Sequence, residues 1–69
     1  MIPQYSRVKL TTNKYDKEGG RAGMLGYVIE SYPGGKYEVE FSDADGITIA
    51  QIVAGEEDLI LANEAEPKS

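Results

Sequence analysis

The run from Tyr37 to Ala50 constrains the fold more than any other part of this chain. Apolar and acidic residues alternate strictly in Tyr-Glu-Val-Glu-Phe at positions 37–41, as is typical of a β-strand with one buried and one exposed face. The polar turn Asp-Ala-Asp-Gly follows at 43–46, and a second β-branched run begins at Ile47. Together they predict a β-hairpin whose first strand carries Glu38 and Glu40 on its outer face.

Further strands are expected on both sides of this hairpin, so that the chain has five in all, at 6–11, 24–32, 36–42, 47–53 and 60–61. A polar segment rich in turn-forming residues separates the first two, and a single helical turn at 54–59 precedes the last. This order matches an all-β, five-stranded SH3-like small barrel, in which closure of the sheet removes most exposed edges. The chain is therefore divided into an irregular lead, a barrel domain and a flexible charged tail, at 1–5, 6–61 and 62–69.

The predicted core is small, because folding of a 69-residue chain hides only about 60% of its surface. The second strand carries apolar residues on both faces and glycines near its start, which favours a bent or bulged strand. A fold with so small a core gains stability from a partner or from self-association. The expected core residues are Val8, Leu10, Leu25, Val28, Tyr37, Val39, Phe41, Ile49, Ile52, Leu59 and Leu61.

The sequence contains neither cysteine nor histidine, and this narrows the possible chemistry. Thiolate and imidazole metal ligands, disulfides and Ser-His or Cys-His nucleophile pairs are all excluded. Asp43 and Asp45 begin like a calcium loop, but the later ligands of that pattern are missing. Gly19-Gly20 lacks the Gly-Lys-Ser/Thr ending of a phosphate-binding loop. We therefore expect no enzyme, no catalytic residue, no metal and no cofactor.

Acidic residues outnumber basic ones by twelve to seven, and the two signs are unevenly spread. Residues 1–23 hold five basic and two acidic side chains, whereas residues 24–69 hold two basic and ten acidic ones. An acidic chain is repelled by phosphate backbones, which makes nucleic-acid binding an unfavoured function. Solvated carboxylates on a soluble surface are the plain interpretation. The functional interpretation is that this charge binds a basic protein partner, such as a nuclease toxin. The expected charged contacts are Glu38, Glu40, Asp43, Asp45, Glu56, Glu57 and Asp58. The side chains expected to be buried by the partner are Tyr15, Tyr32 and Ile47.

No signal peptide is recognisable at the start of the sequence, and no apolar run approaches the ~20 residues of a membrane span. A cytoplasmic location without membrane association is therefore expected. The chain itself is expected to be a monomer or a weak homo-oligomer.

Several segments resemble a bacterial family defined only as domain of unknown function, number four-nine-two-six. The resemblance covers most of 6–61 and rests on residues 8–10, 23–30, 32–35, 36–41, 45–50 and 57–59. Its most specific part is Tyr-Glu-Val-Glu-Phe with the Asp-Gly that follows. The resemblance implies a stand-alone small barrel and, because some members are encoded near nuclease toxins, an antitoxin or immunity role. Ile47 departs from similar sequences, which often carry a polar or basic residue there.

Two alternative functions stay open at this point. The segment 23–28 also resembles the KOW-type barrels of ribosome-associated proteins, which would use a basic, aromatic-lined groove. The residues available for such a groove are Arg7, Lys9, Lys14, Lys17 and Arg21. The other alternative is a structural adaptor subunit of a larger complex.

Overall fold

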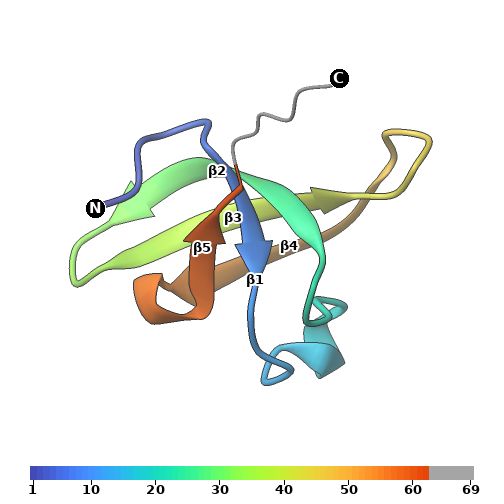
Figure 1. Ribbon diagram of the computed structural model, residues 1–69, viewed down its shortest axis with the longest axis horizontal. Helices are drawn as coiled ribbons and strands as arrows, with labels where there is room; N and C mark the ends of the chain where they lie inside the picture. Colours follow the sequence, from blue (N-terminus) through green and yellow to red (C-terminus); the bar gives the residue numbers. More distant parts are fainter. Residues whose placement is uncertain (63–69) are drawn as a thin grey trace.

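Five antiparallel strands form a single sheet in the computed structural model, which describes residues 1–62 (Figure 1). The order of the strands across the sheet is β4-β3-β2-β1-β5. Two 3-10 turns, η1 and η2, interrupt the connections before β2 and before β5. The elements are β1 (Arg7–Leu10), η1 (Asp16–Glu18), β2 (Leu25–Tyr32), β3 (Lys36–Ser42), β4 (Thr48–Gly55), η2 (Glu56–Asp58) and β5 (Leu59–Leu61).

The predicted fold class is confirmed: the chain is all-β, with five strands and a helical turn directly before the last one. One detail differs from the expectation. The hydrogen-bonded sheet is open within residues 1–62, because β4 and β5 occupy its two edges rather than pairing with each other. The sheet is strongly coiled, so that β1 and β5 run across the direction of β3 and β4 in Figure 1. The predicted flexible tail, 62–69, lies almost entirely outside the described residues.

The first strand of the β3–β4 hairpin has the bounds that the sequence predicts, whereas β4, expected at 47–53, begins at Thr48 and ends at Gly55. Asp43 organises the turn between them with its side chain. Asp43 Oδ1 accepts hydrogen bonds from the backbone N–H groups of Asp45, at 2.9 Å, and of Ile47, at 3.0 Å. Gly46 has φ 81°, a left-handed conformation that glycine adopts without steric cost. An aspartate that bonds backbone N–H groups further along the chain is a standard turn device.

Most of the predicted core is confirmed, but three of its members are on the surface. Leu25, Ile49 and Leu61 are exposed. Ile49 faces outward because it alternates with the buried Ala50 and Ile52, and a register shift, in which Phe41 pairs with Ala50 and Ser42 with Thr48, leaves it without a partner in β3. The core also holds three residues that the sequence analysis did not include. The buried apolar residues are Ile2, Val8, Leu10, Val28, Tyr37, Val39, Phe41, Ala50, Ile52, Ala54 and Leu59.

The core face of β2 is formed by Gly26 and Val28, which pair with Phe41 and Val39 of β3. A Cβ atom at Gly26 would lie 2.7 Å from the carbonyl oxygen of Glu40 and 2.7 Å from Cδ1 of Phe41, so only glycine fits there. The predicted bulge of this strand is present, but it lies at Ile29, between the pairs Val28–Val39 and Glu30–Glu38, and not at the glycines. This bulge reverses the alternation, so that Glu30 turns outward.

The segment between β1 and β2 packs against the edge strand β4. The ring hydroxyl of Tyr15 accepts a hydrogen bond from the backbone N–H of Gly55 at 3.3 Å. A Cβ atom at Gly19 would lie 3.4 Å from Cβ of Ala50, in ordinary contact, and Gly20 is buried beside Ile52. The segment is thus held at both ends of β4.

The part of the chain that the structure describes contains no helix with the length and hydropathy that a membrane crossing requires.

Candidate protein-binding face

The exposed side of the sheet, here called the outer face, carries carboxylates and large apolar side chains in adjacent rows. In one row, Arg7 of β1, Tyr27 of β2, Glu40 of β3 and Gln51 of β4 are consecutive cross-strand partners. In the next row, Glu30, Glu38 and Val53 are partners across β2, β3 and β4. The outer face includes Arg7, Lys9, Leu25, Tyr27, Glu30, Tyr32, Lys36, Glu38, Glu40, Ile49, Gln51, Val53 and Ile60.

Three carboxylates, Glu30, Glu38 and Glu40, lie together on this face. Glu30 stands directly opposite Glu38 in the β2–β3 ladder, and Glu40 is two residues further along β3. Like charges in directly opposite positions of a sheet are destabilising. Within residues 1–62 the ion pairs join the N-terminal amine to Glu56 and Lys14 to Asp58, so no cation is paired with these three carboxylates. Their negative charge is therefore available to an external cation.

Neighbouring hydrogen-bond donors fix the orientation of two of these carboxylates. Glu38 accepts a short hydrogen bond from the hydroxyl of Tyr32 and one of 2.6 Å from Nε2 of Gln51. These bonds stabilise the ionised form and lower the pKa of Glu38, while the bond to Glu38 raises the pKa of Tyr32. Glu40 accepts a bond of 3.0 Å from Oγ1 of Thr48. The ionised form of Glu38 is thus stabilised, and both Glu38 and Glu40 are held in place by hydrogen bonds.

Large apolar side chains surround the carboxylates. Tyr27 is 52% exposed, Ile49 51% and Val53 48%, and Leu25 adds a further partly exposed side chain. Aromatic and aliphatic groups that remain in water on a folded surface are available for burial by a partner. The outer face therefore combines apolar contact area with oriented negative charge.

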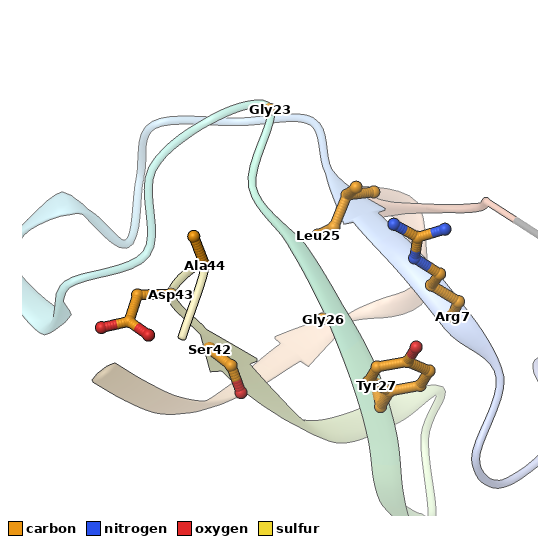
Figure 2. Close-up of a pocket in the computed structure, with 8 residues that line it drawn as sticks. All are labelled: Arg7, Gly23, Leu25, Gly26, Tyr27, Ser42, Asp43 and Ala44. Carbon is orange, nitrogen blue, oxygen red and sulfur yellow. The ribbon is translucent and has the colours of Figure 1, made fainter. Parts of the chain in front are cut away.

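A groove of about 430 Å³ crosses β2 at one end of the outer face (Figure 2). Arg7 lies on one side of β2, and Ser42, Asp43 and Ala44 lie on the other side. The strand itself contributes Leu25, Gly26 and Tyr27 to the lining, and Gly23 lies just before it. The guanidinium of Arg7 and the ring of Tyr27 are thus presented together at the edge of a hollow.

The structure separates the sequence-predicted site residues into three groups. Glu38, Glu40 and Tyr32 lie together on the outer face. Asp43, Asp45 and Ile47 belong to the β3–β4 turn, next to the Ser42 end of β3. Tyr15, Glu56, Glu57 and Asp58 lie at the opposite end, because Gly55 pairs with Lys36 at the start of β3. The seven predicted acidic contacts therefore do not form one continuous surface.

Asp58 and Tyr15 are joined to each other in a partly buried cluster. The Tyr15 hydroxyl donates to Asp58 Oδ2 at 2.8 Å, and Nζ of Lys14 lies 3.1 Å from the same oxygen. Burial opposes ionisation of Asp58, but the bonds from Tyr15 and Lys14 outweigh it and lower the pKa of this carboxyl. Burial and the bond to Asp58 raise the pKa of Tyr15. These two residues anchor the β1–β2 segment and leave little side chain for an external contact.

Glu56 is also engaged within the chain. Its Oε2 lies 2.8 Å from the N-terminal amine, and its Oε1 accepts a bond of 3.4 Å from the hydroxyl of the buried Tyr37. The bond to the amine and the positive charge of that amine lower the pKa of Glu56. The same Tyr37 hydroxyl accepts the backbone N–H of Ile2 at 3.0 Å, which holds the first residues on the domain.

Sequence reasoning missed four contributors to the outer face: Glu30, Tyr27, Gln51 and Val53. Simple alternation places Glu30 on the core side of its strand, and only the bulge at Ile29 brings it beside Glu38. The sequence did contain a signal for Tyr27. Gly26 and Val28 share the core face with Phe41 and Val39, so Tyr27, which lies between them in the strand, must point to the outer face. Among the described residues, no group of three or more acidic side chains has the arrangement that would hold a metal ion.

Comparison with known families gives one result. The family model described as "Domain of unknown function (DUF4926)" matches residues 4–61, which is most of the chain and includes every strand. No curated protein and no solved structure gives a match.

Proposed function

The chain belongs to the DUF4926 family, and from its outer face we propose that it is a non-enzymatic, cytoplasmic module that binds a basic protein. The observation that carries this proposal is the group Glu30, Glu38 and Glu40, three clustered carboxylates without a paired cation among residues 1–62. Repulsion between opposed carboxylates costs stability in the free domain. A partner's arginine or lysine side chains would remove that cost on binding.

The surroundings of the carboxylates suit a protein partner better than a free ion. Binding energy in protein interfaces is concentrated in a few buried anchors, while charged groups mainly accelerate association and fix the register. Tyr27 and Val53 supply anchors of that kind next to Glu38 and Glu40. Tyr32 and Gln51 hold Glu38 in one orientation, which reduces the entropy lost on binding.

Within this class we propose an antitoxin or immunity protein that masks the basic surface of a nuclease. A nuclease must attract phosphate backbones, so its substrate channel is positively charged. An acidic domain with a net charge of −5 is complementary to such a channel. In this role Glu30, Glu38 and Glu40 stand in the place of nucleic-acid phosphates.

The proposed contact surface is narrower than the one expected from sequence. It retains Glu38, Glu40 and Tyr32, and it adds Glu30, Tyr27 and Val53. The hairpin residues Asp43, Asp45 and Ile47 extend it at one end. It leaves out Tyr15 and Asp58, which bond to each other, and Glu56 and Glu57, which lie at the far end of β3.

The double substitution Glu38→Lys and Glu40→Lys tests this proposal against the product of the adjacent gene, which the immunity role requires to be a basic protein. The association rate constant should fall by roughly tenfold or more and should no longer depend on salt concentration. Electrostatic attraction that accelerates the encounter depends on the negative charge of the outer face. Stopped-flow fluorescence at several salt concentrations measures both effects. Inhibition of the partner's nuclease activity is the second readout.

The matched control carries the same change in net charge at η1, as Asp16→Lys and Glu18→Lys, and should retain most of the association rate. Circular dichroism confirms that both variants are folded. An adjacent gene product that is not basic, or one that binds the Glu38→Lys, Glu40→Lys variant as fast as the original chain, would contradict the immunity role.

The nucleic-acid alternative is less supported by the arrangement of the basic residues. Lys14 is paired with Asp58, and Arg7 shares its cross-strand row with Glu40, whose charge opposes phosphate. Fluorescence polarisation with a single-stranded RNA oligonucleotide at low salt separates the two functions. Tight RNA binding that weakens steeply as salt rises would favour the alternative.

A further inference from the structure

Arg7 differs from every other basic residue that the structure describes. Among residues 1–62 it is half-buried, whereas the other five lysines and arginines are exposed. No ion pair or hydrogen bond joins its guanidinium to another residue in this part of the chain. A planar group of N–H donors is therefore partly withdrawn from water without a protein acceptor. Such a group gains free energy when an external acceptor binds it.

The side chain of Arg7 lines one side of the groove shown in Figure 2. The groove lies where β2 and β3 separate, because the β2–β3 ladder ends at the pair Gly26–Phe41. Leu25 and Tyr27 also line it, and its volume of about 430 Å³ falls in the range of about 300–1,000 Å³ that is typical of ligand-binding hollows. Partly apolar walls of this kind strengthen an electrostatic contact made beside them.

The chemistry of the groove favours a carboxylate against Arg7. A guanidinium binds a carboxylate or a phosphate through two parallel N–H···O bonds. A nucleic acid would bring further phosphates towards Glu30, Glu38 and Glu40 on the same face, where they are repelled. A carboxylate on a protein whose neighbouring groups are basic meets no such repulsion.

The opposite side of the groove carries negative charge. Asp43 lies across β2 from Arg7 (Figure 2), and its Oδ1 already accepts two backbone N–H groups of the hairpin turn. The groove therefore has a cation on the β1 side and a carboxylate on the β3 side. An occupant that matches it is acidic towards β1 and basic towards β3.

We propose that the partner places an aspartate or glutamate side chain in this groove, where its carboxylate binds Arg7. The inference rests on the function proposed above and narrows the partner, because a surface that is basic throughout would set a like charge against Arg7. Arg7 is then the residue that distinguishes the cognate protein from other basic proteins, such as those that bind nucleic acids. Charge placement of this kind gives an interface its specificity and its register.

Arg7→Glu tests this inference because the expected result is the opposite of what overall charge predicts. The substitution makes the chain two charges more negative, so attraction to a basic partner alone would keep or strengthen binding. Loss of the pair with the partner's carboxylate should instead raise the dissociation rate constant roughly tenfold or more. The association rate constant should stay the same or rise. Stopped-flow measurements with the product of the adjacent gene give both constants.

Two further variants separate charge from geometry. Arg7→Lys keeps the charge without the planar fork and should give an intermediate dissociation rate. Lys17→Glu on η1 is the matched control, with the same change of charge on an exposed residue away from the groove, and should dissociate as slowly as the original chain. Reversal of one acidic residue of the partner to arginine should restore slow dissociation from Arg7→Glu. Failure of every such reversal would overturn the inference.

NMR of the original chain provides a test that needs no variant to fold. The sequence contains two arginines, Arg7 and Arg21, and therefore gives two Nε–H signals after ¹⁵N labelling. When the partner is added, the signal of Arg7 should shift and exchange more slowly with water. The signal of the exposed Arg21 should stay in place. A shift of Arg21 alone would overturn the inference.

The outcomes distinguish this inference from the proposed function. If Glu38→Lys with Glu40→Lys weakens binding but Arg7→Glu does not dissociate faster, the function stands and the inference is overturned. If neither variant changes the binding, or if the product of the adjacent gene does not bind, both are contradicted. A shift of the Arg7 signal on addition of single-stranded RNA, or with the concentration of the chain alone, would assign the groove to phosphate or to a second copy instead.

Discussion

Phe41→Ala should leave most of the chain unfolded at 25 °C. Phe41 is completely buried near the end of β3, and its ring packs so closely on β2 that no Cβ fits at Gly26. Replacement of a buried phenylalanine by alanine costs about 3–5 kcal/mol. A core of this size rarely supplies more than about 3–5 kcal/mol of net stability. The loss is therefore comparable to the whole free energy of unfolding, and urea denaturation followed by circular dichroism measures it.

Two controls separate the loss of core packing from loss of an aromatic residue in general. Phe41→Leu keeps most of the volume and should cost much less than the alanine variant. Tyr27→Ala removes an exposed ring from the adjacent strand and should change the unfolding midpoint only slightly. Equal destabilisation by Tyr27→Ala and Phe41→Ala would mean that the two faces of the sheet are assigned the wrong way round.

Asp58→Ala should destabilise the chain by about 1–3 kcal/mol at pH 7, because it removes the acceptor of a partly buried Tyr15 hydroxyl. Asp58 is only 7% exposed and links the β1–β2 segment to η2. Tyr15→Phe is the complementary change and should cost less than Asp58→Ala, because the carboxylate keeps its ion pair with Lys14. If Asp58→Ala left the urea midpoint unchanged, the cluster would contribute nothing to the anchoring of this segment.

Lowering the pH should remove the contribution of Asp58 to the free energy of unfolding, because the pKa of this carboxyl is lower in the folded chain than in the unfolded chain. The folded-state pKa lies below the usual 3.8, so around that pH the unfolded chain binds more protons than the folded one. Stability from this group is complete above the unfolded pKa and is lost as pH falls through the folded pKa. The difference in stability between the original chain and Asp58→Asn should therefore shrink from about pH 5 towards pH 2. A difference that stays constant over that range would contradict the assigned pKa shift.

Alternation and turn chemistry were sufficient to predict most of the strands. β3 has the predicted bounds because its alternation is strict, and because Asp43 and Gly46 fit only a tight turn. The misplacement of Leu25 and Ile49 has a physical cause. Leu25 lies three residues before Val28, and Ile49 three residues before Ile52, so each has the opposite parity in its strand to the buried residue with which it was grouped. Ile2 was missed because its burial depends on Tyr37, which is 35 residues away.

The candidate site was less predictable than the fold. Glu38 and Glu40 could be placed on one face because they lie two residues apart in a strand. Whether Glu56, Glu57 and Asp58 would join them depended on how the chain returns after β4, which local patterns do not determine. The fold sends them to the opposite end of β3 from Asp43. Glu30 lies beside Glu38 only because of the bulge at Ile29, and the residues around Glu30 in the sequence do not predict that bulge.

The anchored β1–β2 segment has a consequence for the behaviour of this chain at high concentration. β4, with the sequence Thr-Ile-Ala-Gln-Ile-Val-Ala-Gly, contains no charged residue and no proline, although it lies at an edge of the sheet. Uncharged segments of this kind are the ones that stack into cross-β fibrils when their edges are free. Tyr15 and Gly19 pack on opposite ends of β4 and cover part of this strand. Release of Tyr15 from Asp58 should therefore uncover one end of an uncharged edge strand and favour its pairing with other chains.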